Sequence, residues 1–170
     1  MLLQSILQTT GLLIPQIFIL NMKYLLSHIE GLSFEQRVDY LKTCYPDYSQ
    51  GSSRAVIPMC DKYVLKIAYN IKGVLQNEIE HTVYSEIPVY YKRFLAKIKK
   101  VSPTYSWIIQ ERVEVEDCWV KRIFPQSFLD IMCDRFNLCI GDLDQNGKVG
   151  NRFKIYDYGL SHKLFHTHYT

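Results

Sequence analysis

The sequence predicts an α+β fold with an antiparallel sheet. Hydrophobic periodicity and turn residues indicate the order helix, two strands, helix, two strands, helix and a short hairpin, and strands joined by short turns pair in antiparallel fashion. The chain has 170 residues, 48% of them hydrophobic, with 13 Tyr and 8 Phe that can supply a core. A chain of this length is expected to form one domain, or one domain with an appendage.

The first 21 residues differ from the rest because they contain no charged side chain. They lack the basic start of a signal peptide, and Pro15 interrupts an apolar run that is short for a bilayer span. We therefore expect residues 1–21 to be an apolar extension outside the core. Residues 22–170 are expected to form a single domain, with membrane attachment of the extension as the less favoured alternative.

The net charge indicates which binding partners to expect, and the cysteine content indicates the cellular compartment. The formal net charge is +3 and no long run of Lys and Arg occurs, so no nucleic-acid partner is expected. The 5 cysteines are odd in number and include no CxxC motif. Free thiols in a reducing, cytoplasmic setting are the simplest interpretation.

The first predicted helix of the core has clear start and stop signals. Ser33 and Gln36 form a capping box, with Ser33 as the N-cap residue. The helix is expected to end near Cys44, because the residue before Pro46 is biased away from helical conformation.

The remaining elements are predicted from the spacing of apolar residues and from turn residues. Asn146-Gly147 and Gly150-Asn151 are turn signals near the end of the chain. In chain order, the predicted elements are a strand at 54–59, a turn at 60–62, a strand at 63–69, a helix at 74–86, strands at 94–98 and 106–113, a helix at 125–137 and a strand at 153–156.

Three features of this framework suggest chemistry. Lys66 lies inside an apolar strand, and a lysine is rarely buried without a partner because desolvating an ammonium group is costly. A small polar turn at 51–53 precedes the first strand of the pair. Asp157 follows an apolar strand and precedes a Tyr-Gly turn, which suits a Mg²⁺ ligand.

The order of elements and these features resemble the protein-kinase-like superfamily over about residues 51–159, and the lysine strand with its following helix is similar to small kinase-like proteins of bacteria and phages. The resemblance implies an antiparallel N-lobe sheet with one main helix at about 22–112, a hinge, and a truncated C-lobe at 113–170. The segments that carry it are GSSRAV at 51–56, VLKI at 64–67, QNEIE at 76–80, WIIQERV at 107–113, CIGDL at 139–143 and IYDYG at 155–159.

The resemblance implies that the protein binds ATP. Lys66 would neutralise phosphate charge and pair with Glu80, or else with Glu78, since both border the apolar stripe of the helix. Gln110 falls at the gatekeeper position. The other implied contacts to ATP are Gly51, Ser52 and Ser53 over the phosphates, Val56 and Val64 against the base, and the backbone of Glu111 and Val113 at the edge of the base.

Catalytic and metal-binding residues are implied in the last part of the chain. Asp142 would accept or orient the proton of the substrate hydroxyl, and Asn146 and Asp157 would hold Mg²⁺. The loop departs from the family pattern, because three residues separate Asp142 from Asn146 where the family has four, and the preceding histidine is absent. An alternative alignment makes Asn137 the metal residue and leaves Met132 at the catalytic position, which would describe a pseudokinase.

Three functions remain open from the sequence. Only 11 residues follow Gly159, too few for an activation segment and peptide-docking helices, so a conventional regulated protein kinase is not expected. We favour a small phosphotransferase, or a nucleotidyl transferase, that uses ATP and Mg²⁺ with an unknown acceptor. The alternatives are a degenerate pseudokinase that binds another protein, and a small α+β interaction module.

Overall fold

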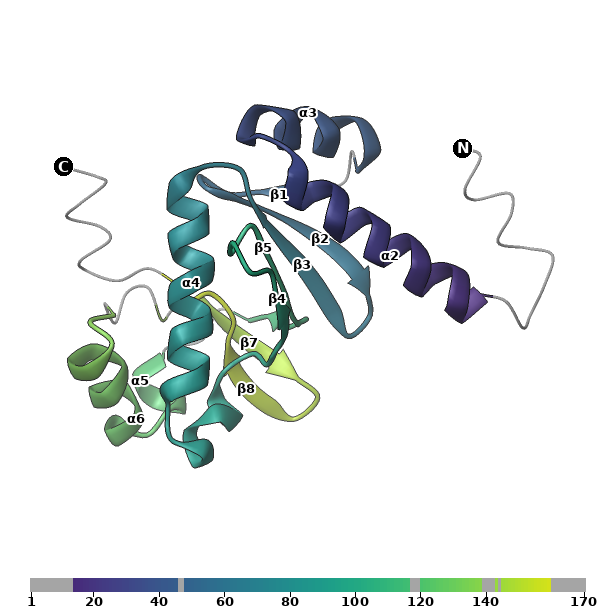
Figure 1. Ribbon diagram of the computed structural model, residues 1–170. Coiled ribbons are helices and arrows are strands. Elements are labelled where there is room, and N and C mark those ends of the chain that lie inside the picture. Colours follow the sequence, from purple (N-terminus) through teal and green to yellow (C-terminus); the bar gives the residue numbers. More distant parts are fainter. Residues whose placement is uncertain (1–13, 46–47, 117–119, 139–142, 144, 160–170) are drawn as a thin grey trace. The chain divides into compact units, whose positions relative to one another are not determined.

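The computed structural model describes residues 14–45, 48–116, 120–138, 143 and 145–159 (Figure 1). The chain divides into two compact units, Met1–Leu32 and Ser33–Thr170. The second unit has the α+β fold that the sequence predicts, with a five-stranded antiparallel sheet and a smaller three-stranded sheet. The described residues of both units together form five α-helices.

The first unit contains helix α2, which extends over Ile14–Gly31. The helix therefore continues through the boundary expected after residue 21. Pro15 lies in its first turn, where a helix has no intrahelical use for the N–H group that proline lacks. No helix among the described residues is long and apolar enough to cross a membrane.

The large sheet has the strand order β1-β2-β3-β5-β4, and every neighbouring pair is antiparallel. Lys66 lies near the middle of this sheet, opposite Val56 on one side and Ile108 on the other. The strands are β1 (Ser49–Gln50), β2 (Arg54–Cys60), β3 (Tyr63–Ala68), β4 (Ile98–Val101) and β5 (Trp107–Glu111).

The small sheet follows the large one in the chain and has the order β6-β7-β8. Its strands are β6 (Glu114–Val115), β7 (Asn146–Val149) and β8 (Arg152–Ile155). The helical elements of the second unit are α3 (Phe34–Cys44), α4 (Ile71–Glu86), the 3₁₀ helix η1 (Val89–Phe94), α5 (Val120–Ile123), α6 (Gln126–Asp130) and the π-helical turn η2 (Ile131–Arg135).

Helix α3 has the predicted capping box. The hydroxyl of Ser33 accepts from the backbone N–H of Gln36, and the Gln36 side chain accepts from the Ser33 N–H. Arg37 ties this helix to the large sheet, because its buried guanidinium donates to the carbonyl of Ala68 at 3.0 Å and to the hydroxyl of Ser106 at 2.9 Å.

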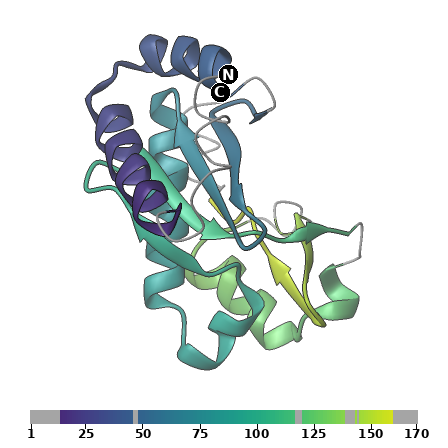
Figure 2. The ribbon, with the colours of Figure 1, turned by 90° about the vertical axis from the view of Figure 1, so that its right-hand side faces the viewer.

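Helix α4 connects the large sheet to the rest of the second unit. Its N-cap is Asn70, whose side chain accepts from the N–H of Gly73 at 3.0 Å. Figures 1 and 2 show the helix lying against the large sheet, with its C-terminal end beside the small sheet and the short helices α5 and α6. There Val83 and Ile87 join an apolar core with Phe124 and Phe128.

The predicted strand at 94–98 is wrong. Residues 89–94 form the 3₁₀ helix η1, and β4 begins only at Ile98. In a 3₁₀ helix the side chains of residues i and i+3 lie on the same side. Tyr91 and Phe94 have this spacing, and both rings contact Phe128, so their burial in one aromatic cluster favours the helical turn.

The predicted helix at 125–137 is correct in position but irregular in form. Helix α6 continues into the π-helical turn η2 rather than as a regular α-helix. Asn137 then has a left-handed backbone with φ of 56°, a conformation that asparagine adopts more readily than most residues. This exposed asparagine ends the helical segment.

Candidate functional site

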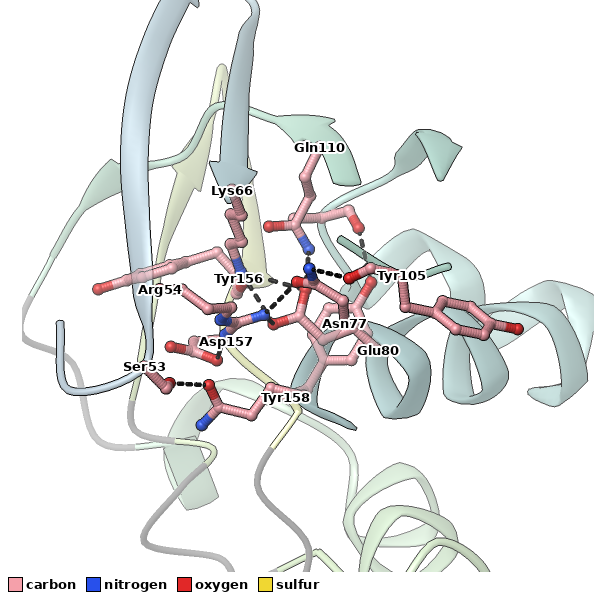
Figure 3. A network of polar contacts seen from close by, with 12 residues as sticks. Ser53, Arg54, Lys66, Asn77, Glu80, Tyr105, Gln110, Tyr156, Asp157 and Tyr158 are labelled. Atoms are coloured by element: carbon pink, nitrogen blue, oxygen red, sulfur yellow. Dashed lines mark hydrogen bonds and ion pairs between the residues drawn. The ribbon is translucent and has the colours of Figure 1, made fainter. Parts of the chain in front are cut away.

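Lys66 is paired with Glu80, and Figure 3 shows the two side chains at the centre of a polar network. The ammonium nitrogen of Lys66 donates to both carboxylate oxygens of Glu80, at 2.9 and 3.1 Å, and to the carbonyl of Tyr156 at 2.6 Å. An ammonium group has three N–H donors, so these contacts satisfy all of them. Glu78, the other candidate partner, is exposed on the opposite side of α4.

Arg54 is a central member of this network, and the sequence analysis did not single it out. Its Nη1 lies 2.7 Å from Oε1 of Glu80 and donates to Oδ1 of Asn77 at 3.1 Å, while its Nη2 donates to Oδ1 of Asp157 at 2.6 Å. The sequence did contain a sign that Arg54 lies near Lys66. Side chains alternate between the two faces of a strand, so Arg54 is on the same face of β2 as Val56, which lies opposite Lys66 on β3. Two cations on one buried face require more than one carboxylate.

The four charged side chains are shielded from water to different degrees. The exposed fractions are 5% for Arg54, 4% for Lys66, 0% for Glu80 and 24% for Asp157. Asp157 is therefore the most accessible charge of the group. Two cations and two anions balance one another, which is the condition under which charges are tolerated in an interior.

The environment shifts the pKa of each of these groups. Burial acts against the charged form of Asp157, but Arg54 and Lys66 beside it lower the pKa of the carboxyl to about 2. Burial opposes the charge of Arg54 as well, yet Glu80 and Asp157 raise its pKa. Desolvation lowers the pKa of Lys66 and raises the pKa of Glu80. The contact between Arg54 and Asp157, at 2.6 Å, is also the shortest ion pair of the network.

Two glycines allow loops to reach α4 closely. A Cβ atom on Gly73 would lie 2.3 Å from the carbonyl oxygen of Ser53, and one on Gly159 would lie 2.6 Å from the carbonyl oxygen of Gln76. The Ser53 hydroxyl also donates to the side-chain oxygen of Gln76. Both the polar turn before β2 and the Tyr-Gly turn after β8 are therefore held against the first half of α4. Tyr158 is fully buried there and donates to the carbonyl of Ala96 at 2.9 Å.

A cavity of about 630 Å³ opens beside this network. Its walls come from the large sheet, the segment between β5 and β6, and the segment after β8. Arg54, Gln110 and Tyr156 contribute to the lining. Among the residues that the sequence analysis singled out for the site, those that line the cavity are Gly51, Ser52, Ser53, Val56, Val64, Lys66, Gln110, Glu111, Val113 and Asp157.

The remaining predicted residues have different positions. Glu80 is buried behind Lys66, where it also accepts from Nε2 of Gln110 at 3.2 Å. Asn146 is buried at the start of β7 and pairs with Ile155 in the ladder. Asp142 lies outside the described residues, so its role stays a prediction.

The described residues do not fit a divalent cation as they are arranged. Among them, no cluster of three or more His, Cys, Asp or Glu side chains is close enough to hold a metal ion. Oδ1 of Asp157 is engaged by Arg54, and Glu80 accepts from Arg54, Lys66 and Gln110. Asn146 and Asp157 as Mg²⁺ ligands therefore stay a prediction.

Comparison of the chain with protein-family models, with curated proteins and with solved structures found no match.

Proposed function

We propose that the protein binds a nucleoside triphosphate, specifically ATP, in this cavity, and that its site is of the protein-kinase-like type. The observation that carries the proposal is the Lys66–Glu80 pair with Asp157 beside it, at the wall of a cavity of about 630 Å³. Residues that are far apart in the chain, among them Ser53, Lys66 and Asp157, line this one cavity, and this supports the proposal.

The cavity offers separate surfaces for the parts of a nucleotide. Val56 and Val64 supply an apolar wall on which a planar base can lie, and Glu111 and Val113 bring backbone polar groups to its edge. The turn at 51–53 brings backbone N–H groups near the buried cations Arg54 and Lys66. Backbone N–H groups and cations together are the usual ligands of phosphate.

We propose phosphoryl transfer to a hydroxyl group as the activity, with Asp142 as the residue that orients this hydroxyl. The supporting evidence is the resemblance of the segment at 139–143 to a catalytic loop. A second candidate is a pseudokinase that binds nucleotide without transfer. The observation that favours it is the 2.6 Å contact of Arg54 with Asp157, the residue at which the resemblance expects metal.

Blocking the cavity tests the binding proposal. Val64→Trp places an indole against the wall proposed for the base, and we expect ATP affinity measured by calorimetry to fall by at least about tenfold. Val89→Trp is the matched control, because Val89 is exposed on η1 and does not line this cavity. Saturating ATP should also raise the stability of the wild-type protein, by about 2.7 kcal/mol at 100 times the Kd.

The transfer step is tested separately with γ-labelled ATP. Asp142→Asn should leave ATP affinity within about threefold of wild type and abolish transfer, because a group that handles the hydroxyl proton acts in the transition state. Binding without transfer in the wild type would favour the pseudokinase. Absence of ATP binding at about millimolar concentration, with and without Mg²⁺, would refute the proposed function and leave the interaction module as the alternative.

A further inference from the structure

One guanidinium group holds the two carboxylates of the candidate site. Arg54 contacts Glu80 through Nη1 at 2.7 Å and Asp157 through Nη2 at 2.6 Å. Glu80 comes from the middle of α4 and Asp157 from the segment after β8, so the planar group joins two elements that are far apart in the chain. Bridging carboxylates from separate elements beside a phosphate site is also what a bound divalent cation does.

The charge balance at the site is complete without a metal ion. Arg54 and Lys66 supply two positive charges, and Glu80 and Asp157 supply two negative charges. A divalent cation at Asp157 would lie beside the positive guanidinium, which already holds Oδ1 of this carboxylate. Mg²⁺ sheds its water ligands reluctantly and requires near-octahedral oxygen coordination, so a carboxylate already bound to arginine is a poor ligand for it.

Arg54 also has donor groups to spare. A guanidinium carries five N–H groups, and the contacts of Arg54 with the described residues use three of them, to Glu80, Asn77 and Asp157. The residue lines the cavity together with Lys66. Arginine binds phosphate oxygens with a planar fork of donors, which suits a triphosphate placed in this cavity.

We infer that Arg54 takes the place of a divalent cation at this site: the protein without nucleotide binds no divalent ion at Asp157, and nucleotide phosphates bind to the remaining donors of Arg54, beside Lys66, without requiring one. The second half of this inference rests on the proposed function. The first half does not, because it concerns the unliganded protein. Mg²⁺ that arrives on the nucleotide itself is a separate matter, since it is held by the phosphates.

Manganese binding to the full chain without nucleotide tests the first half. The electron paramagnetic resonance signal of free Mn²⁺ falls when the ion is bound, so a titration measures the Kd directly. The wild-type protein should bind Mn²⁺ no more tightly than about 1 mM, a weak value for protein sites. Arg54→Gln frees Oδ1 of Asp157 and removes one of the partners of Glu80, so this variant should bind Mn²⁺ at least about tenfold more tightly. Adding Asp157→Asn to this variant should remove the gain.

The matched control is Arg135→Gln, which also removes one arginine from a glutamate. Arg135 contacts Glu86 at 3.4 Å with both side chains exposed, so the change frees a solvated carboxylate away from the cavity and should leave Mn²⁺ binding as in the wild type. Thermal unfolding shows whether Arg54→Gln folds. If it does not, the wild type still decides the question: Mn²⁺ binding tighter than about 1 mM that is lost in Asp157→Asn would overturn the inference.

Nucleotide affinity in the presence of a chelator tests the second half. The Kd of the wild-type protein for ATP should change by less than about threefold between EDTA and excess Mg²⁺, whereas a loss of about tenfold or more in EDTA would overturn this half. Failure to bind ATP under both conditions would refute the proposed function and the second half together. The manganese titration needs no nucleotide, so it would still decide the first half.

Discussion

The two halves of helix α4 are both buried, but they are buried in opposite kinds of surroundings. The polar half, by which we mean Ile71 to Glu80, places Gln76, Asn77 and Glu80 in the polar network. The apolar half, from His81 to the C-cap residue Ile87, places Val83 and Ile87 in an apolar cluster with aromatic rings from η1, from α6 and from Phe124, which follows α5. One continuous helix of 16 residues thus extends from a buried cluster of charged side chains to a buried apolar cluster.

The comparison shows two ways of stabilising the same helix. In the polar half each buried donor or acceptor needs a specific partner, so the loss of one group leaves others unsatisfied. In the apolar half the stabilisation grows with the area buried and the quality of packing, so it declines gradually as atoms are removed. The polar half should therefore respond to substitution as a unit, and the apolar half in proportion to the volume lost.

The largest effect is expected from Glu80→Gln. The change leaves Arg54 and Lys66 buried with Asp157 as their remaining anion, and removing one partner of a buried ion pair costs about 4 kcal/mol. Urea unfolding measures the loss. Arg135→Gln at the exposed pair with Glu86 is the control and should cost less than about 0.5 kcal/mol.

The energetic coupling between Lys66 and Glu80 is a second test of whether the polar half responds to substitution as a unit. If the polar half acts as a unit, Lys66→Met combined with Glu80→Gln should cost less than the sum of the two single changes, by about 1 kcal/mol or more. Additive costs would show that the two side chains are energetically independent despite their 2.9 Å contact.

In the apolar half we expect the free energy of unfolding to fall in proportion to the side-chain volume removed. Ile87 is 2% exposed within the apolar cluster, so Ile87→Ala should cost about 3 kcal/mol and Ile87→Val about 1 kcal/mol. Both values come from urea unfolding under the same conditions. A valine variant as damaging as the alanine variant would contradict the proposed difference between the halves.

The last expected effect concerns the pH dependence of stability and involves the polar half alone. The pKa of Asp157 is lowered from 3.8 to about 2 in the folded protein. A lowered carboxyl pKa contributes stability that is present above the unfolded-state value and is lost as the pH falls through the folded-state value. We expect Asp157 to contribute about 2 kcal/mol near neutral pH, lost between about pH 4 and about pH 2.

Unfolding free energies of the wild type and Asp157→Asn across this pH range measure the contribution. The gap between the two proteins should shrink as the pH falls, because a protonated aspartate and an asparagine are both neutral. Asp134→Asn, at an exposed position on η2, is the control and should differ from wild type by less than about 0.5 kcal/mol throughout. A gap that stays constant down to about pH 2 would contradict the ionic role of Asp157.

The sequence by itself determined the elements whose signals are local. The capping box at Ser33, the turn after β2, the strands around Lys66 and the core helix before Ile87 were all predictable, because capping and periodicity depend on residues a few positions apart. It also indicated that Lys66 must have a partner, since the energetic penalty of burying an ammonium group does not depend on the fold.

Only the tertiary structure decided which groups meet. Glu80 rather than Glu78 faces Lys66 because of the way α4 is rotated about its axis against the sheet. The sequence places the two glutamates only two positions apart and does not reveal this rotation. Residues 89–94 form a 3₁₀ helix because their rings pack on Phe128, a contact that local pattern does not encode. The bridge from Arg54 to Asp157 joins residues 103 positions apart, and so its effect on the site emerges only when β2 and the segment after β8 are packed on the same helix.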